Sequence, residues 1–352
     1  MVSISCVLPS ARDSYTVLDL PDLHIFQSPF ESMSRQTFRD FELVICDSLW
    51  PSRRDFVEEK NWGFEVKYVP PHPNHRYWID RGRWAVCEQL NSAILQAEGE
   101  LLVRVDDCSM FDPSYLQRIW DEYQKGNFLL AMHSRWHGGK QAYYTSEYLE
   151  NGYEAKYSAA REPDRRATLD RIYGKGQPVR DTRWPVVEQR GGRMAAPPEW
   201  FYGYSACSLE AMLKINGYNE RFDSDKSEED QNCGLRLALA GYTNFVLDTR
   251  HTVIEHEHGP VSEMVIKPGQ KVMKCNHALY LLDEMRRSYY ANSRKLSRGD
   301  CDWIRANICP ICPNHVRCKT EELGGRFYND DLIEQFLAGQ RTFDLREERM
   351  TI

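Results

Sequence analysis

The chain has 352 residues, of which 41% are hydrophobic and 12% aromatic, and a formal charge of −7. This length suits one large domain with an appendage, or two domains, and the composition is that of a globular protein. The acidic balance excludes a protein that binds polyanions over its whole surface. No N-terminal leader pattern and no stretch of about 18 apolar residues occurs, so we expect no transmembrane segment and a cytoplasmic location.

Apolar runs alternate with helical patterns through the first 110 residues. Buried strands are predicted for four runs rich in β-branched and apolar side chains, at 2–8, 41–46, 64–69 and 101–105. Apolar residues recur at steps of three or four from 84 to 97, which predicts an amphipathic helix ended by Gly99, and the latter part of 18–38 also has helical spacing. This order predicts an α/β fold whose central sheet is mostly parallel and flanked by helices.

The middle of the chain is interrupted by Gly, Pro, Arg and Tyr, and we interpret about 150–198 as a long loop or insertion. Residues 156–193 carry ten Lys and Arg against five Asp and Glu, a local charge of +5 that leaves about −12 for the remainder. A diphosphate, an anionic acceptor such as nucleic acid, or solvent alone would suit this segment. Its arginines include Arg165, Arg166, Arg171, Arg180, Arg183 and Arg193.

Regular structure is expected again after this segment. Helices are predicted at 208–215 and 227–240, each followed by glycine, and a strand at 244–247. Beyond residue 260 the pattern is mainly helical, with a helix expected at 277–289.

Two carboxylates, Asp106 and Asp107, directly follow an apolar predicted strand. Open parallel α/β sheets bind their ligands at the carboxyl ends of strands, and Mg²⁺ and Mn²⁺ prefer oxygen ligands. The pair therefore suits a divalent ion that bridges a diphosphate. Two acidic residues at a strand end also serve simply as turn residues, and spacing along the chain has to decide.

Three ordered blocks give that spacing, and together they resemble glycosyltransferase family 2. The blocks are QTFRDFELVICDS at 36–48, NSAILQAEGELLVRVDDCSMFDPSYL at 91–116 and NGYNERFDSDKSEEDQNCGLRLALAGY at 216–242. The resemblance implies a GT-A fold over 1–260, with a nucleotide-sugar-binding half at 1–110 and an acceptor half at 111–260. It also implies a nucleoside-diphosphate sugar donor, expected to be a UDP-sugar, and an inverting transfer.

The same resemblance assigns the donor side of the site. Asp47 matches the carboxylate that contacts the base or ribose, or is a turn residue, and Pro9, Ser10 and Arg12 would line the same pocket. Asp106 matches the first aspartate of the family's D-x-D element, with Pro113 fixing the register.

The second aspartate of D-x-D falls on Cys108, which is a departure from the family. Three explanations are open: Asp107 supplies the second carboxylate, Cys108 ligates a softer metal, or one carboxylate suffices. We favour Asp107, because Mn²⁺ and Mg²⁺ prefer oxygen to thiolate.

The acidic segment at 227–230 allows two interpretations. Ser227 and Asp230 resemble a helix capping box, and acidic side chains suit a helix N-terminus. Followed by Leu235, Arg236 and Gly241, however, Glu229 and Asp230 match the family's E-D element. The resemblance makes Asp230 the general base and Glu229 a group that positions the acceptor.

Further site residues follow from position in the family. His256 or His258, just beyond the last predicted strand, would complete the metal or pyrophosphate site. The acceptor is expected to contact the segment Trp200, Phe201, Tyr202 and Gly203, although these aromatic side chains equally suit a core.

Four of the eleven cysteines are clustered near the C-terminus, at Cys301, Cys309, Cys312 and Cys318. Thiolates at such spacings suit a tetrahedral Zn²⁺ site that would hold together a helical extension at 261–352. An iron–sulfur cluster, disulfides or thiols without metal are the alternatives, and His315 would be able to replace one cysteine.

The sequence thus predicts a divalent-metal-dependent glycosyltransferase that acts on a glycan or another hydroxyl acceptor. One alternative is a viral enzyme that glycosylates a hydroxylated DNA base, for which the basic segment would supply phosphate contacts. Another is a catalytically inactive GT-A module used for binding, which the departure at Cys108 makes conceivable.

Overall fold

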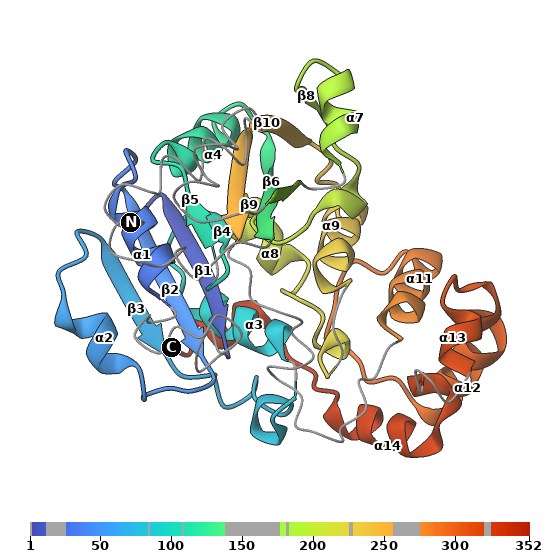
Figure 1. The fold of residues 1–352 in the computed structure, drawn as a ribbon. Helices are drawn as coiled ribbons and strands as arrows, with labels where there is room; N and C mark the ends of the chain where they lie inside the picture. Colours follow the sequence, from blue (N-terminus) through green and yellow to red (C-terminus); the bar gives the residue numbers. More distant parts are fainter. Residues whose placement is uncertain are drawn as a thin grey trace.

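The computed structural model contains two β-sheets covered by helices, with a helical lobe on one side (Figure 1). It describes residues 2–11, 26–83, 85–107, 109–137, 177–180, 183–224, 228–255, 275–319 and 325–352. Among these residues, no helix is long and apolar enough to cross a bilayer.

The first sheet carries the predicted parallel core. Its order is β3 (Glu65–Val69), β2 (Phe41–Asp47), β1 (Ile4–Ser10), β4 (Leu101–Arg104) and β9 (Ala206–Ser208). The first four strands are parallel, and β9 is antiparallel to β4. Every residue of β1, β2 and β4 is buried, which explains their continuous apolar character.

The second sheet is mixed. Its order is β5 (Ser109–Phe111), β10 (Phe245–Glu255), β6 (Phe128–His137) and β7 (Gln177–Arg180), and β8 (Arg193–Ala195) also pairs with β10. Only the β10–β6 pair is parallel. β10 extends the strand predicted at 244–247 by eight residues, because it finds ladder partners on both sides.

Helices cover these sheets. They are α1 (Gln27–Ser34), α2 (Arg54–Glu59), α3 (Val86–Gln96), α4 (Tyr115–Tyr123), α7 (Trp184–Gln189), α8 (Leu209–Lys214) and α9 (Glu229–Leu239), with 3₁₀ turns η2 (Ile79–Arg81), η6 (Pro198–Trp200) and η7 (Glu220–Phe222). Helix α3 packs against β1 and β2, and α9 packs against η6.

The C-terminal part forms the lobe and then returns to the first sheet. The lobe consists of α11 (Asn276–Arg286), α12 (Arg298–Asn307), η8 (Cys309–Ile311), α13 (His315–Lys319), η9 (Arg326–Tyr328) and α14 (Asp330–Gly339). Helix α15 (Leu345–Arg349) then contacts α3, and the C-terminus lies back beside the sheet (Figure 1). The predicted helical extension is therefore packed onto the α/β core.

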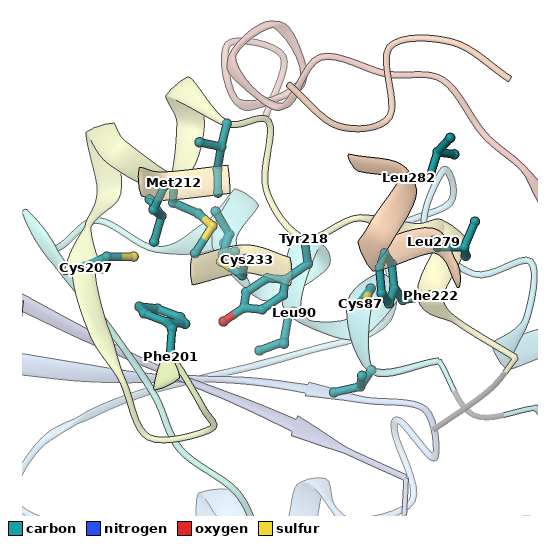
Figure 2. Close-up of a cluster of buried hydrophobic side chains, with 14 of the residues drawn as sticks. Cys87, Leu90, Phe201, Cys207, Met212, Tyr218, Phe222, Cys233, Leu279 and Leu282 are labelled. Atoms are coloured by element: carbon teal, nitrogen blue, oxygen red, sulfur yellow. The ribbon is translucent and has the colours of Figure 1, made fainter. Parts of the chain in front are cut away.

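One large apolar cluster joins the lobe to the core. Figure 2 shows Leu279 and Leu282 of α11 beside Cys87 of α3 and Phe222 of η7. Farther along the same cluster lies Phe201, next to the α8–α9 region. The α9 helix therefore has apolar neighbours both in the core and in the lobe.

The predicted strands and the α3, α8, α9 and α11 helices are confirmed, with boundaries shifted by a few residues. Two expectations need correction. The stretch after residue 111 contains α4 and β6, which were not predicted, and the end of the expected loop contains α7, β8 and η6. These short elements depend on tertiary partners such as the β8–β10 ladder, which local periodicity does not reveal.

Candidate functional site

The register of the first sheet gathers polar side chains at its carboxyl edge. Ser10, the last residue of β1, pairs with Asp47, the last residue of β2, and Val7 pairs with Arg104 at the end of β4. Ser10 and Asp107 each lie three residues beyond the Val7–Arg104 pair, and there Ser10 Oγ donates to Asp107 Oδ2 at 2.9 Å. Parallel pairing therefore brings together residues that are 37 and 97 positions apart in the chain.

Asp47 is fully buried and hydrogen-bonded. Its Oδ1 accepts from the Leu49 backbone N–H at 2.9 Å, and its Oδ2 accepts from Tyr68 Oη at 2.7 Å. Burial raises the pKa of Asp47, while Arg53, Leu49 and Tyr68 oppose that rise. The bond to Leu49 is the contact of a turn residue, so the turn role is present in the structure and the donor contact stays a prediction.

Arg53 links this carboxylate to the end of β1, and the sequence analysis did not single it out. Its Nε lies 3.5 Å from Asp47 Oδ2, and its Nη1 donates to Ser10 Oγ at 3.0 Å. Its guanidinium also lies 5.2 Å from the ring centroid of Phe26. A buried arginine between two strand ends supplies positive charge at the edge where anionic ligands bind in such sheets.

The two consecutive aspartates have different surroundings. The Asp107 residue is 4% exposed and is engaged by Ser10. The Asp106 side chain is 27% exposed and faces Arg104 and Gly203, with its Oδ1 3.6 Å from Arg104 Nε. Asp106 is therefore the more accessible carboxylate, and the expectation that Asp107 replaces the family's second aspartate stays a prediction.

Glu229 and Asp230 occupy the first turn of α9. Asp230 Oδ2 accepts from the Gly203 backbone N–H at 3.1 Å, and its Oδ1 accepts from the Gln231 N–H at 2.7 Å. Glu228, the N-cap, has φ of +69° and no side-chain capping bond. Ser227 lies outside the described residues, so the capping box predicted from Ser227 and Asp230 stays a prediction.

A close helix approach makes the contact between Asp230 and Gly203 available. Gly234 of α9 packs on η6 so tightly that a Cβ there would lie 2.1 Å from the Pro198 carbonyl oxygen. Only glycine permits that approach. It brings the start of α9 to the loop after η6, and thereby Asp230 to Gly203.

Arg104 lies between the two groups of carboxylates, and the sequence analysis did not identify it. It is 7% exposed, and its guanidinium lies 3.6 Å from both Asp106 Oδ1 and Glu229 Oε1. Its Nε and Nη1 have no hydrogen-bond partner within the part of the chain that the structure describes. A charged residue at the end of an otherwise apolar strand was the available sequence signal.

Burial dominates the protonation of the acidic pair. It raises the pKa of Glu229 to about 7, together with the neighbouring Asp230 charge, while Arg104 opposes the rise. Burial also raises the pKa of Asp230, again against Arg104. A carboxylate whose pKa is raised toward neutrality is a stronger base, which suits proton abstraction.

The segment expected to contact the acceptor is divided between core and surface. Phe201 is 1% exposed and packs against Phe245, so it is part of the core, and its contact with an acceptor stays a prediction. Tyr202 is half-buried beneath the guanidinium of Arg183, 4.3 Å from its ring centroid. Arg183 also donates to the Trp200 carbonyl at 2.7 Å. Gly203 is the member of this segment that contacts the carboxylates, through Asp230 and beside Asp106.

Several predicted site residues lie outside the described part of the chain. They are Arg12, Cys108, His256, His258 and most of the basic segment, including Arg165, Arg166 and Arg171. Of the arginines that are described with their side chains, Arg193 makes a paired contact with Glu122, at 2.8 Å to each oxygen. That contact is structural.

The described residues fit a divalent ion in a limited way. Asp106 offers one accessible carboxylate, and Mg²⁺ sites in phosphate chemistry often use one or two carboxylates plus phosphate oxygens. Within the described ranges, three close potential ligands occur together at His72, His75 and Glu348, away from these aspartates. Both ring nitrogens of His75 already contact carboxylates, Glu220 at 2.6 Å and Glu348 at 2.8 Å, so we interpret that group as an ionic contact.

The structure changes the predicted cysteine cluster. Cys309, Cys312 and Cys318 line one cavity together with Cys275, which the sequence analysis had not included. Cys301 does not line it; this residue is fully buried in α12, within the large apolar cluster. The spacing of cysteines along the chain did not indicate Cys275, because this residue is distant from the other three in sequence but adjacent to them in space.

The parallel sheet with an antiparallel neighbour, flanked by helices and carrying carboxylates at its edge, is a GT-A fold. The structure matches residues 1–349 of S. aureus TarS in complex with UDP-GlcNAc, with a TM-score of 0.52 and 13% identity over 96% of this chain and 81% of that one. The UDP complex of the same TarS segment matches with a TM-score of 0.49 and 12% identity, over 99% and 89% of the two chains. A mycobacterial protein matches with a TM-score of 0.41 and 15% identity, over 83% and 76%. No family model and no curated protein matches the chain.

Proposed function

We propose that this chain is a glycosyltransferase that moves a sugar from a UDP-sugar to an acceptor hydroxyl. The observation that carries the proposal is the meeting of carboxylates from separate elements: Asp106 after β4, and Glu229 and Asp230 at the start of α9, joined through Arg104 and Gly203. They lie at the carboxyl edge of the parallel strands, where α/β sheets bind ligands. The fold matched by the structure is that of a protein complexed with UDP-GlcNAc, which supports this donor class.

The donor side is formed by the ends of β1 and β2. The base and ribose would face Asp47, Ser10 and Pro9. Arg53 fixes the first two of these side chains, through an ion pair with Asp47 and a hydrogen bond to Ser10 Oγ. Asp106, the more accessible aspartate, would bind Mn²⁺ or Mg²⁺, with Asp107 and a histidine at 256 or 258 as its proposed partners. Such an ion would neutralise the charge of the departing diphosphate.

Asp230 would remove the acceptor proton. As the acceptor oxygen attacks the anomeric carbon, its proton passes to a carboxylate oxygen of Asp230 and the bond from that carbon to the diphosphate breaks, which releases UDP. The backbone N–H groups of Gly203 and Gln231 fix the carboxylate in one orientation, as a general base requires. Attack opposite to the leaving group would invert the anomeric configuration. Glu229 would position the acceptor.

The test is Asp230→Asn, which keeps the shape of the side chain and removes its basicity. We expect at least about a hundredfold loss of transfer, the usual contribution of a general base, with donor binding largely retained. Transfer is measured as product mass after screening UDP-sugars against glycan and DNA acceptors with Mn²⁺ or Mg²⁺. Donor binding is measured by calorimetry.

The matched control is Asp121→Asn, an exposed aspartate on α4, which should change neither quantity. Loss of donor binding in Asp230→Asn would contradict its assignment as base. If the native chain binds a UDP-sugar yet forms no product and releases no UDP with any donor, the proposed activity fails and an inactive binding module is favoured.

A further inference from the structure

Four cysteines from three separate segments surround one cavity in the lobe. Cys275 is the N-cap of α11, Cys309 begins η8, Cys312 follows it, and Cys318 lies in α13. The cavity holds about 10 Å³ and is also lined by His277, His315 and Tyr328, among others. All four cysteines are buried. Buried sulfurs that line one cavity are donors of the kind that a structural zinc site uses.

The distance between two of the sulfurs agrees with such a site. Cys275 Sγ and Cys318 Sγ are 3.7 Å apart. A disulfide would need about 2.05 Å, whereas tetrahedral zinc with Zn–S of about 2.3 Å places its sulfurs about 3.8 Å apart.

Polar groups surround the sulfurs. The Phe327 backbone N–H bonds to the Cys275 sulfur, and the Asn314 N–H bonds to the Cys312 sulfur two residues before it. Tyr328 bonds to the Cys309 sulfur, and its Oη lies 2.9 Å from His315 Nδ1. Such outer contacts orient metal ligands and stabilise their negative charge.

We propose that Cys275, Cys309, Cys312 and Cys318 bind one Zn²⁺, and that Cys301 is not a ligand. The spacing becomes C-x33-C-x2-C-x5-C, in which Cys309-Pro310-Ile311-Cys312 supplies the close pair. Four thiolates complete a tetrahedral ligand set without His277 and His315, which also line the cavity and whose Nδ1 atoms face Glu228 and Tyr328. A closed four-thiolate site has no open position, so its role is structural.

The proposed site would fix the start of α11, and α11 packs against α9, the helix that carries Glu229 and Asp230. His277, two residues after Cys275, lies with its Nδ1 3.1 Å from Glu228 Oε1, directly before the acidic pair of α9. Farther along, Asp283 Oδ2 accepts from Asn232 Nδ2 of α9 at 2.9 Å. A metal that fixes Cys275 would therefore also fix the position of α9.

The first experiment measures metal content by elemental mass spectrometry of the full chain, purified under reducing conditions without chelator. We expect one zinc per chain in the native protein and in Cys301→Ser, the matched control. Zinc should be close to zero in Cys275→Ser and Cys318→Ser. Native-like zinc content in Cys275→Ser, or loss of zinc in Cys301→Ser, would overturn the ligand assignment.

The second experiment keeps the proposal testable if a ligand variant does not fold. X-ray absorption at the zinc edge of the native chain should give four sulfur neighbours at about 2.3 Å and no nitrogen. A disulfide between Cys275 and Cys318, iron with labile sulfide, or a chain that takes up no zinc when Zn²⁺ is supplied, would each contradict the proposal. None of these readouts depends on transfer activity, so they stand or fall apart from the proposed function.

Discussion

Arg104 is a positively charged residue that lies between carboxylates of the candidate site. It is buried at the end of β4 and lies 3.6 Å from carboxylates on both sides, Asp106 and Glu229. Its charge opposes the rise that burial causes in the pKa values of Glu229 and Asp230. It therefore helps to keep the proposed base ionised near neutral pH.

Replacing it tests that role. In Arg104→Met the pKa of Asp230 should rise further, because its cationic neighbour is gone while burial remains. The base is active only when deprotonated, so the acidic limb of the pH–rate profile should move to higher pH and the rate on that limb should fall. The measurement is UDP release against pH. Arg39→Met, an exposed arginine, is the control; an unshifted profile in Arg104→Met would contradict the role.

His75 joins three elements that are distant in sequence. It follows β3, is fully buried, and its two ring nitrogens contact Glu220 of η7 and Glu348 of α15. Burial by itself lowers the pKa of His75, but Glu220 and Glu348 outweigh it and raise the value to about 10. The folded state therefore holds the proton more tightly than the unfolded chain does.

The pH dependence of stability follows from that shift. The contribution of His75 is fully present below its ordinary pKa of 6.5 and is lost as pH rises through about 10. His75→Gln should lower the free energy of unfolding by about 3 kcal/mol near pH 6, because the buried Glu220 and the half-buried Glu348 lose their partner. Denaturant unfolding at several pH values checks this, with His72→Gln as the control. A deficit that stays constant up to about pH 11 would contradict the ionic role.

How far elements could be predicted depended on where their stabilisation comes from. The strands β1 and β2 are buried apolar runs, and α3 has apolar residues at helical spacing, so their own residue patterns predict them. The β8 strand is three residues long with an exposed pattern and exists because β10 pairs with it. Likewise, the position of α9 depends on Gly234. A glycine is needed there because Pro198 lies against it, and that contact exists only in the folded chain.

At the scale of the whole molecule, the last residues of the chain complete the α/β core. Leu345 is fully buried, its N–H donates to Asn216 Oδ1 at 2.8 Å, and its side chain fills the space beside Gly217. Arg349 of the same helix donates to the Ile94 carbonyl of α3. The lobe therefore begins with a helix that packs on the α/β core and is followed by another: α11 contacts α9, and α15 contacts α3. The part of the extension expected at 261–352 that the structure describes thus packs on the core.

Removal of residues 342–352 should therefore destabilise the entire protein. We expect the melting temperature to fall by more than about 5 °C, because a buried leucine and the His75–Glu348 contact are lost together. Thermal unfolding followed by circular dichroism measures this. Removing only Thr351 and Ile352, which are exposed, should leave the melting temperature unchanged. An equal effect of both truncations would mean that α15 contributes nothing specific.

The sequence by itself predicted an α/β fold with a mostly parallel sheet and the positions at which polar residues follow its strands, because buried strands and helices have characteristic spacings of apolar residues. The GT-A fold was implied by the resemblance of three sequence blocks to glycosyltransferase family 2. The sequence also placed Asp47, Asp106, Glu229 and Asp230 in ordered blocks, whose roles remain proposals. Tertiary structure alone decided which groups meet: the charge of Arg104 between two carboxylates, the return of α15 to α3, and the place of Cys275 in the cavity that Cys309, Cys312 and Cys318 line. Such contacts join positions far apart in the chain, and no local pattern encodes a distance in space.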